Sequence, residues 1–345
     1  MVPPGEVLST KLLSFCLLSI GFTLYLLFIS SGLTDGFSDS PSPKDELSHP
    51  TYRGRYAIAT FLAAKFDTKQ EDSDDEDAHY VSARTLVYQL LHSPTTKFQE
   101  PVPVVILVTK DVRESKRQRL RDDGAVVVEV EHLAHDMAIT VDRWAETIIK
   151  LRFFDPRIVP YEKVLLLDTD MVLTRPIGAI FQDPATEVRH TDRSALVESD
   201  APAPPEEFIM AASPESLQFD HPYPFLDPEN TKDYFDSGLL MYSPSIELFQ
   251  YYMELINKPD LFHTGTPVQD LLNYAHRWGG PMPWKRVHYS WYLNWPNDND
   301  LKGNMSLLHT KGWDHAFSYS SDAVKKFAFA RRWEMEGYWI GKERS

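Results

Sequence analysis

A short aliphatic run at residues 164–167, followed at once by two acidic residues, constrains the fold more than any other stretch of the chain. Its Val and Leu side chains predict a strand buried on both faces of a parallel sheet. Residues two apart on a strand point to the same side, so Asp168 and Asp170 are expected to project together from its carboxyl end. Open α/β sheets bind their ligands at that end.

Two neighbouring carboxylates repel each other unless a cation lies between them. Their hard oxygen atoms suit Mg²⁺ or Mn²⁺. The alternative is a strand that runs into an acidic turn and binds nothing, which is common for an isolated Asp-x-Asp pattern. The choice between the two therefore depends on the rest of the chain.

Strands and helices alternate in the sequence up to the acidic pair. Strands are expected at 56–62, 102–109, 125–130 and 164–167, and helices at 80–91, 112–122 and 142–154. This β-α-β-α-β-α-β order predicts an α/β domain with a mostly parallel, Rossmann-like central sheet flanked by helices. The acidic run at 65–77 is expected to be a solvated loop.

The second half of the chain is less regular and contains proline-rich loops. Short strands are expected at 207–212, 237–243 and 306–309, and helices at 245–258, 266–277 and 321–339. The last helix has an apolar stripe that indicates a packing face, toward the core or near a membrane.

Residues 12–33 form an almost uninterrupted apolar stretch, long enough to cross a hydrocarbon core of ~30 Å. A cleaved signal peptide is the alternative, but the stretch exceeds the usual apolar region of such peptides. We expect a transmembrane signal anchor. Residues 1–11 would form a cytosolic tail, 34–52 a stem and 53–345 one luminal domain, as in a type II membrane protein.

The composition excludes several functional classes. A net charge of −15 argues against nucleic-acid binding, which requires a basic face. The single cysteine, Cys16, lies inside the apolar stretch. The rest of the chain therefore contains no thiol for a disulfide, a zinc–thiolate site or cysteine catalysis.

Several motifs, in this order, resemble those of glycosyltransferase family 8, the glycogenin-like retaining nucleotide-sugar transferases. They are the strand at 56–61, Tyr80 before a helix, Lys150, the stretch 167–173 around the acidic pair, 236–241, 269–273 and the segment from Leu308 to Gly312. The resemblance covers roughly residues 55 to 315. Residues 333–339 are similar to the fungal, membrane-anchored branch of the family.

This resemblance implies a GT-A-like fold and a retaining hexosyltransferase. It implies that Asp168, Asp170 and His309 hold Mn²⁺ or Mg²⁺, and that Asp236 and Gln269 act in catalysis or sugar positioning. Residues implied to bind a nucleotide sugar, UDP-linked by expectation, are Thr60, Phe61, Tyr80, Arg84, Lys150, Asp168, Thr169, Asp170, Ser237, Gly238, Lys311 and Gly312. The acceptor would be a glycan, lipid or protein, and the location the Golgi or ER membrane.

The chain also departs from the family pattern. Asp236 replaces the usual Asn, Val268 replaces an Asp, and the Lys-Pro-Trp sequence after the final His-x-x-Gly is absent, with Lys311 as a possible substitute. One alternative is therefore a catalytically silent, anchored protein that binds a nucleotide sugar or a partner. A nucleotidyltransferase is disfavoured because the loop after the first strand is acidic. His309 also admits a purely structural role, and Arg84 and Lys150 that of surface cations.

Overall fold

The computed structural model describes residues 54–63, 77–135, 147–200, 203–216, 219–225, 233–311 and 320–344, all within the unit Pro50–Ser345. The expected tail, anchor and stem at 1–11, 12–33 and 34–52 lie outside the described residues, as does nearly all of the acidic run. Among the helices of the described part, none is long and apolar enough to cross a bilayer.

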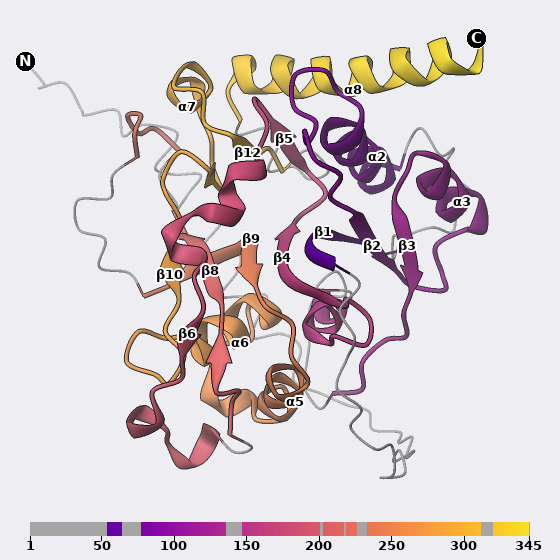
Figure 1. Ribbon diagram of the computed structural model, residues 1–345. Coiled ribbons are helices and arrows are strands. Elements are labelled where there is room, and N and C mark those ends of the chain that lie inside the picture. The colour runs from indigo at the N-terminus through magenta and orange to yellow at the C-terminus, as the bar shows by residue number, and fades with distance from the viewer. Residues whose placement is uncertain are drawn as a thin grey trace, which may run out of the picture. The chain divides into compact units, whose positions relative to one another are not determined.

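A seven-stranded sheet forms the centre of this unit (Figure 1). Its strands, in spatial order, are β10 (Lys285–Arg286), β8 (Met210–Pro214), β9 (Phe235–Tyr242), β4 (Tyr161–Leu167), β1 (Gly54–Leu62), β2 (Val104–Val108) and β3 (Val126–Glu129). β9 runs antiparallel to both neighbours, and the remaining pairs are parallel. The predicted mostly parallel sheet is confirmed.

Helices cover both faces of this sheet, as expected for an α/β domain. One face is covered by α2 (Ala78–Leu91) and α3 (Glu114–Asp122), and the other by α5 (Ile246–Leu255) and α6 (Pro267–Ala275). α8 (Asp322–Glu343) packs against α2 and against the short α7 (Asp298–Lys302). Along β4, Val164 and Leu166 enter a core with α5 and α6, whereas Leu165 and Leu167 enter a core with α2. Figure 1 shows α2 and the α5–α6 pair on opposite sides of β4. Burial on both faces explains why this strand reads as a continuous apolar run.

Two smaller sheets complete the fold. In the first, β12 (Leu307–His309) lies between β11 (Tyr292–Leu293) and β5 (Met171–Leu173). In the second, β6 (Arg189–His190) pairs with β7 (Glu207–Phe208). Short 3₁₀ turns occupy Gly178–Gln182, Pro184–Thr186, Arg193–Ala195, Glu198–Asp200 and Pro259–Leu261.

Three expected elements differ from the observed ones. In the helix expected at 142–154, the described part is a 3₁₀ helix, Ile148–Phe154, with six of its seven residues buried, so that packing outweighs local helix propensity. The strand expected at 207–212 divides into β7 and β8, which belong to different sheets. The strand expected at 306–309 joins β5 and β11 outside the central sheet.

Gln89 fixes β5 against α2. Its side chain is fully buried; Nε2 donates to Met171 O at 3.2 Å, and Oε1 accepts from Leu173 N at 2.8 Å. Both backbone groups of β5 would lose their partner in Gln89→Leu. Because each unpaired buried group costs ~1–3 kcal/mol, we expect the free energy of unfolding to fall by about 2–4 kcal/mol in denaturant titrations.

A matched control is available on α3. Gln118 is exposed, and its side-chain amide bonds Asp122 and Arg121 of the same helix, so Gln118→Leu should change the free energy of unfolding by less than about 0.5 kcal/mol. Equal effects of the two substitutions would show that Gln89 does not hold β5.

Candidate functional site

The acidic pair lies in a turn between two strands of different sheets. β4 ends at Leu167, the turn contains Asp168, Thr169 and Asp170, and β5 begins at Met171. The amide of Asp168 donates to Gly238 O at 2.9 Å, which ties the turn to β9. The two carboxylates thus converge through a turn, and not through alternate positions on a strand as expected.

His309 reaches this turn through strand pairing. β12 runs antiparallel to β5, with His309 opposite Met171, and Thr310 N donates to Asp170 O at 3.2 Å. The imidazole Nε2 lies 3.1 Å from Oδ1 of Asp170 and 3.9 Å from Oδ2 of Asp168. One ligand atom from each of the three residues falls within 4.8 Å of the others. The structure therefore brings the three expected ligands together.

Asp170 has the properties of a cation ligand. Its side chain is fully buried; Oδ1 pairs with His309 Nε2 at 3.1 Å, and Oδ2 has no hydrogen-bond partner among the described residues. Leaving a buried charged oxygen without a partner is costly, and a divalent cation held by Asp168, Asp170 and His309 would satisfy it. Two carboxylates and an imidazole form a mixed oxygen and nitrogen set, which fits Mn²⁺ better than Ca²⁺.

The charges of this cluster stabilise one another without a metal. Burial by itself would lower the pKa of His309, but the Asp170 carboxylate outweighs it and raises that pKa to about 9. Burial would likewise raise the pKa of Asp170, but the charge on His309 lowers it to about 2. A bound cation would replace the proton on His309, because a ligating nitrogen must be unprotonated.

Buried hydrogen bonds hold the His309 ring at Nδ1, the nitrogen that does not face Asp170. The Tyr292 hydroxyl lies 2.6 Å from His309 Nδ1 and donates to Oδ1 of Asp236. The same Oδ1 accepts from Gly238 N at 2.8 Å. Such outer contacts orient a metal-binding histidine. The structure thus places Asp236, expected to act in catalysis, beside the cluster of Asp168, Asp170 and His309. Its Oδ1 accepts hydrogen bonds from Tyr292 and Gly238.

Two lysines bring positive charge to the cluster. Lys150 Nζ lies 2.6 Å from Oδ1 of Asp168 and 5.2 Å from the ring centre of Phe61. Lys311 Nζ lies 3.2 Å from His309 Nδ1. Burial opposes the charge of Lys311, but nearby Asp236, Asp170 and Asp168 outweigh it and raise its pKa. Lys311 is therefore held as a cation beside the cluster, and the side-chain amine of Lys150 contacts Asp168.

Gln269 belongs to a set of hydrogen-bonded polar residues next to Ser237. Its Oε1 accepts from Ser237 N at 2.8 Å, and its Nε2 donates to Oε2 of Glu215 at 3.0 Å. Asn294 donates to the other oxygen of Glu215 at 2.5 Å. Glu215 and Asn294 were missed by the sequence reasoning. The position of Glu215 directly after β8, at the end of a buried strand, is the signal that could have identified it.

Glu215 is expected to make stability depend on pH. Burial, and then the charge of Asp236, raise its pKa from 4.5 to about 7. The native state therefore binds this proton more tightly than the unfolded chain. The stabilisation is complete below the unfolded pKa and is lost as pH rises through about 7. Melting temperatures should fall more steeply between pH 5 and 8 for the wild type than for Glu215→Gln.

An exposed glutamate on β4 serves as the control for this titration. Glu162 lies at the solvent-facing start of that strand, so Glu162→Gln should keep the wild-type slope of melting temperature against pH. Parallel slopes for the wild type and Glu215→Gln would contradict the assignment of this pH dependence to Glu215.

The other expected site residues are placed differently. Arg84 binds Asp123 through Nε at 2.7 Å, so its guanidinium pairs with a carboxylate next to α3 and not with Asp168 or Asp170.

Tyr80 has a cation near its ring, because Lys116 Nζ lies 5.2 Å from the ring centre. Thr60 is buried on β1, and its hydroxyl has no hydrogen-bond partner among the described residues. Gly312 lies outside the described residues. Val268 packs in the core beside α5.

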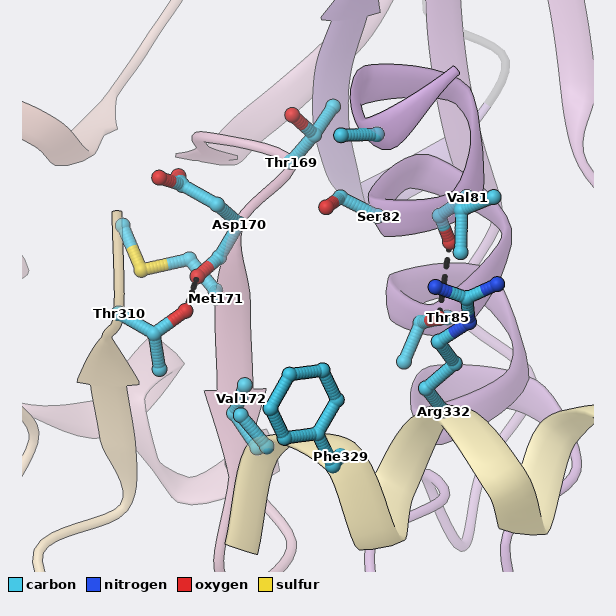
Figure 2. A pocket seen from close by; sticks show the side chains of 12 residues that line it. Val81, Ser82, Thr85, Thr169, Asp170, Met171, Val172, Thr310, Phe329 and Arg332 are labelled. Carbon is cyan, nitrogen blue, oxygen red and sulfur yellow. Dashed lines mark hydrogen bonds between the residues drawn. The ribbon is translucent and has the colours of Figure 1, made fainter. Parts of the chain in front are cut away.

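A pocket of about 170 Å³ adjoins the acidic turn on the side of α2 (Figure 2). α2 contributes Ser82 and Thr85, and α8 contributes Phe329 and Arg332. Thr169, expected to contact the nucleotide sugar, lines this pocket. Asp170 also lines the pocket, and in Figure 2 its carboxylate points away from Ser82.

Comparison with known proteins gives distant relatives. No protein-family model matches the chain. Two uncharacterized proteins of Schizosaccharomyces pombe are similar to it. C4C3.09 is 25% identical over 296 residues, covering 79% of this chain and 74% of that protein. C5H10.12c is 24% identical over 269 residues, covering 70% and 71% respectively.

Solved glycosyltransferase structures are also similar to the chain. An active-site mutant of LgtC has a TM-score of 0.48 at 13% identity, covering 82% of this chain and 95% of that one. The glycosyltransferase GlyE of Streptococcus pneumoniae has 0.45 at 12%, covering 84% and 64%. Mouse xyloside xylosyltransferase 1 has 0.43 at 12%, covering 74% and 97%. With all three scores below 0.5, we infer the function from the residues of the site.

Proposed function

We propose that the chain is a metal-dependent glycosyltransferase of the glycogenin-like family 8 type with a GT-A-like domain. It would move a hexose from a UDP-linked sugar to a glycan, lipid or protein acceptor and retain the anomeric configuration. The observation that carries this proposal is the cluster of Asp168, Asp170 and His309, in which the buried Oδ2 of Asp170 lacks a donor. The ordered family-like motifs of the sequence support it.

The chemistry required is departure of a nucleoside diphosphate with growing negative charge. A divalent cation, when bound, stabilises that charge and orients the two phosphates. Asp168, Asp170 and His309 would hold it. Lys150 and Lys311 would supply further positive charge, and their existing contacts with Asp168 and His309 keep both ammonium groups near the cluster.

The residues near Ser237 are candidates for sugar positioning. Asp236 is ionised, because the charges of Lys311 and His309 outweigh its burial and lower its pKa. Gln269 connects the backbone of Ser237 to Glu215. The raised pKa of Glu215 lets it hold a proton near neutral pH and donate a hydrogen bond to a sugar hydroxyl or an acceptor.

A catalytically silent, anchored nucleotide-sugar or partner-binding protein is the second candidate. The specific observation in its favour is Val268, which is buried in the core where the family pattern has an acidic residue. Both candidates would reside in the Golgi or ER membrane as type II proteins with the domain in the lumen.

The decisive experiment is a panel of nucleotide sugars tested with and without Mn²⁺ on the full chain. Melting temperature reports binding, and release of nucleoside diphosphate reports turnover. We expect one donor to raise the melting temperature and to be hydrolysed only with Mn²⁺. Stabilisation without turnover for every donor, with and without candidate acceptors, would favour the silent alternative, and neither effect for any donor would overturn both.

A further inference from the structure

One asparagine of the chain stands in the acceptor pattern for N-linked glycosylation. The pattern is Asn-x-Ser or Asn-x-Thr, with x other than proline, and it occurs once in the whole sequence, at Asn304, Met305 and Ser306. A single match of this kind often arises by chance. Its meaning therefore depends on where the fold places the amide of Asn304 and the hydroxyl of Ser306.

Asn304 lies in an exposed turn between two elements. The helix α7 ends at Lys302, Gly303 caps it, and β12 begins at Leu307. Asn304 is exposed and has a φ of 58°, a left-handed conformation in which asparagine is enriched among the residues other than glycine. Figure 1 shows α7 at the margin of the unit. The fold therefore leaves room for a bulky group on this side chain.

The amide nitrogen of Asn304 donates no hydrogen bond within the described part of the chain, in contrast to the other asparagines there. Each of those uses its Nδ2 as a donor: Asn257, Asn273, Asn294, Asn297 and Asn299. Asn304 uses only Oδ1, which accepts from the Thr174 hydroxyl at 3.3 Å. A glycan replaces one hydrogen of Nδ2 and leaves Oδ1 as an acceptor, so glycosylation is compatible with every contact of this side chain.

The hydroxyl of Ser306 has no use in the fold. Ser306 is fully buried, and its Oγ has no hydrogen-bond partner among the described residues. A buried hydroxyl without a partner costs free energy that an alanine would avoid. The folded state thus gives no reason for a serine at this position, whereas recognition of the pattern on the chain before it folds does.

We propose that Asn304 is a glycosylation site that receives an oligosaccharide from a lipid diphosphate carrier as the chain enters the lumen. The inference rests on the luminal placement given with the proposed function. In the reaction Nδ2 forms a bond to C1 of the oligosaccharide, and the bond between C1 and the diphosphate oxygen breaks. The proton lost from Nδ2 balances the charge of the departing lipid diphosphate.

The glycan would lie at the far end of β12 from His309. β12 runs antiparallel to β5, with His309 opposite Met171, whereas Asn304 contacts Thr174, which follows β5. Asn304 precedes His309 by five positions, which at ~3.3 Å per residue separate them by at most ~17 Å. Because the glycan is attached beyond the other end of the strand pair, we expect its loss to leave Mn²⁺-dependent turnover unchanged.

The test expresses the full chain in a fungal host and compares electrophoretic mobility before and after treatment with peptide N-glycosidase. We expect this enzyme to remove one glycan from the wild type and to convert Asn304 to aspartate, which mass spectrometry reads directly. Asn304→Gln and Ser306→Ala should each migrate like the deglycosylated wild type. The matched control is Asn257→Gln, an exposed asparagine outside the pattern, which should keep the glycan.

Two further measurements separate glycosylation from folding and from location. Ser306→Ala loses no hydrogen bond, so it should unfold at the same denaturant concentration as the deglycosylated wild type. Asp192→Asn creates the pattern with Arg193 and Ser194, in a stretch of three exposed residues, and asparagine caps such a turn as well as aspartate does. Added to Asn304→Gln, this substitution should restore one glycan.

Two outcomes would overturn the proposal. A glycan on the double variant but not on the wild type would mean that the domain is luminal and that Asn304 is not used. No glycan on either protein would mean that the domain does not enter the lumen. Release of nucleoside diphosphate with Mn²⁺, measured on the same proteins, tests the proposed transferase activity separately from both outcomes.

Discussion

Replacing Asp168 and Asp170 together by alanine is expected to reduce Mn²⁺-dependent release of nucleoside diphosphate by at least ~10²-fold, because the departing charge loses its stabilisation. The conservative Asp170→Asn should lose the metal effect while keeping the shape of the turn. In both variants the melting temperature should no longer rise on adding Mn²⁺. Product release and thermal unfolding, each measured over a Mn²⁺ titration, check these results.

The control for lost negative charge is Asp111→Ala. Asp111 is exposed beyond β2, so this variant should keep both turnover and the Mn²⁺-dependent rise in melting temperature. Full activity in the double alanine variant would refute the assignment of the metal to this turn. Loss of activity in Asp111→Ala to the same extent would show that net charge, and not ligation, is responsible.

Gly238→Ala is expected to damage the fold and the site together. A Cβ at this position would lie 2.7 Å from Asp236 Oδ1, 2.8 Å from His309 Cε1 and 2.8 Å from the Tyr292 hydroxyl. Overpacking of this kind typically costs ~1–3 kcal/mol. Relieving these close contacts would displace His309, or Tyr292 and Asp236, which hold it by hydrogen bonds. We therefore expect turnover to fall by ~10²-fold or more.

Gly279→Ala supplies the comparison, since its added Cβ meets nothing within 4 Å. Its free energy of unfolding should stay within about 0.5 kcal/mol of the wild type, with unchanged Mn²⁺ response. Denaturant unfolding and metal-dependent turnover, measured for both alanine variants, test whether a side chain at position 238 disturbs the fold and the site. A Gly238→Ala protein with wild-type turnover would mean that His309 tolerates displacement and is not a ligand.

The sequence predicts the central part of the fold because its signals are local. β4 is buried on both faces, and the aliphatic run at 164–167 reports this directly. The alternation of strands and helices up to Asp168 likewise follows from periodicity and yields the parallel half of the sheet. The 3₁₀ form of Ile148–Phe154 is not predictable in this way, because burial among distant residues determines it.

The candidate site is predictable only in part, for a related reason. Asp168, Asp170 and His309 stand in recognisable motifs, whereas Glu215 and Tyr292 enter the site through contacts between segments far apart in the chain. The two cations expected in the site, Lys150 and Arg84, also have different partners. Lys150 meets Asp168, but Arg84 meets Asp123, and no sequence pattern tells which acidic residue a given cation will pair with.

The pairing of β12 with β5 also determines when the site can exist during synthesis. Thr310 bonds to the backbone of Asp170 across 140 positions of sequence, so the acidic turn is made long before its histidine emerges. Contacts of such long range close late because loop-closure entropy opposes them. A nascent or truncated chain that ends before β12 would therefore hold the two aspartates without His309, and metal binding that needs all three residues would report completion of the fold.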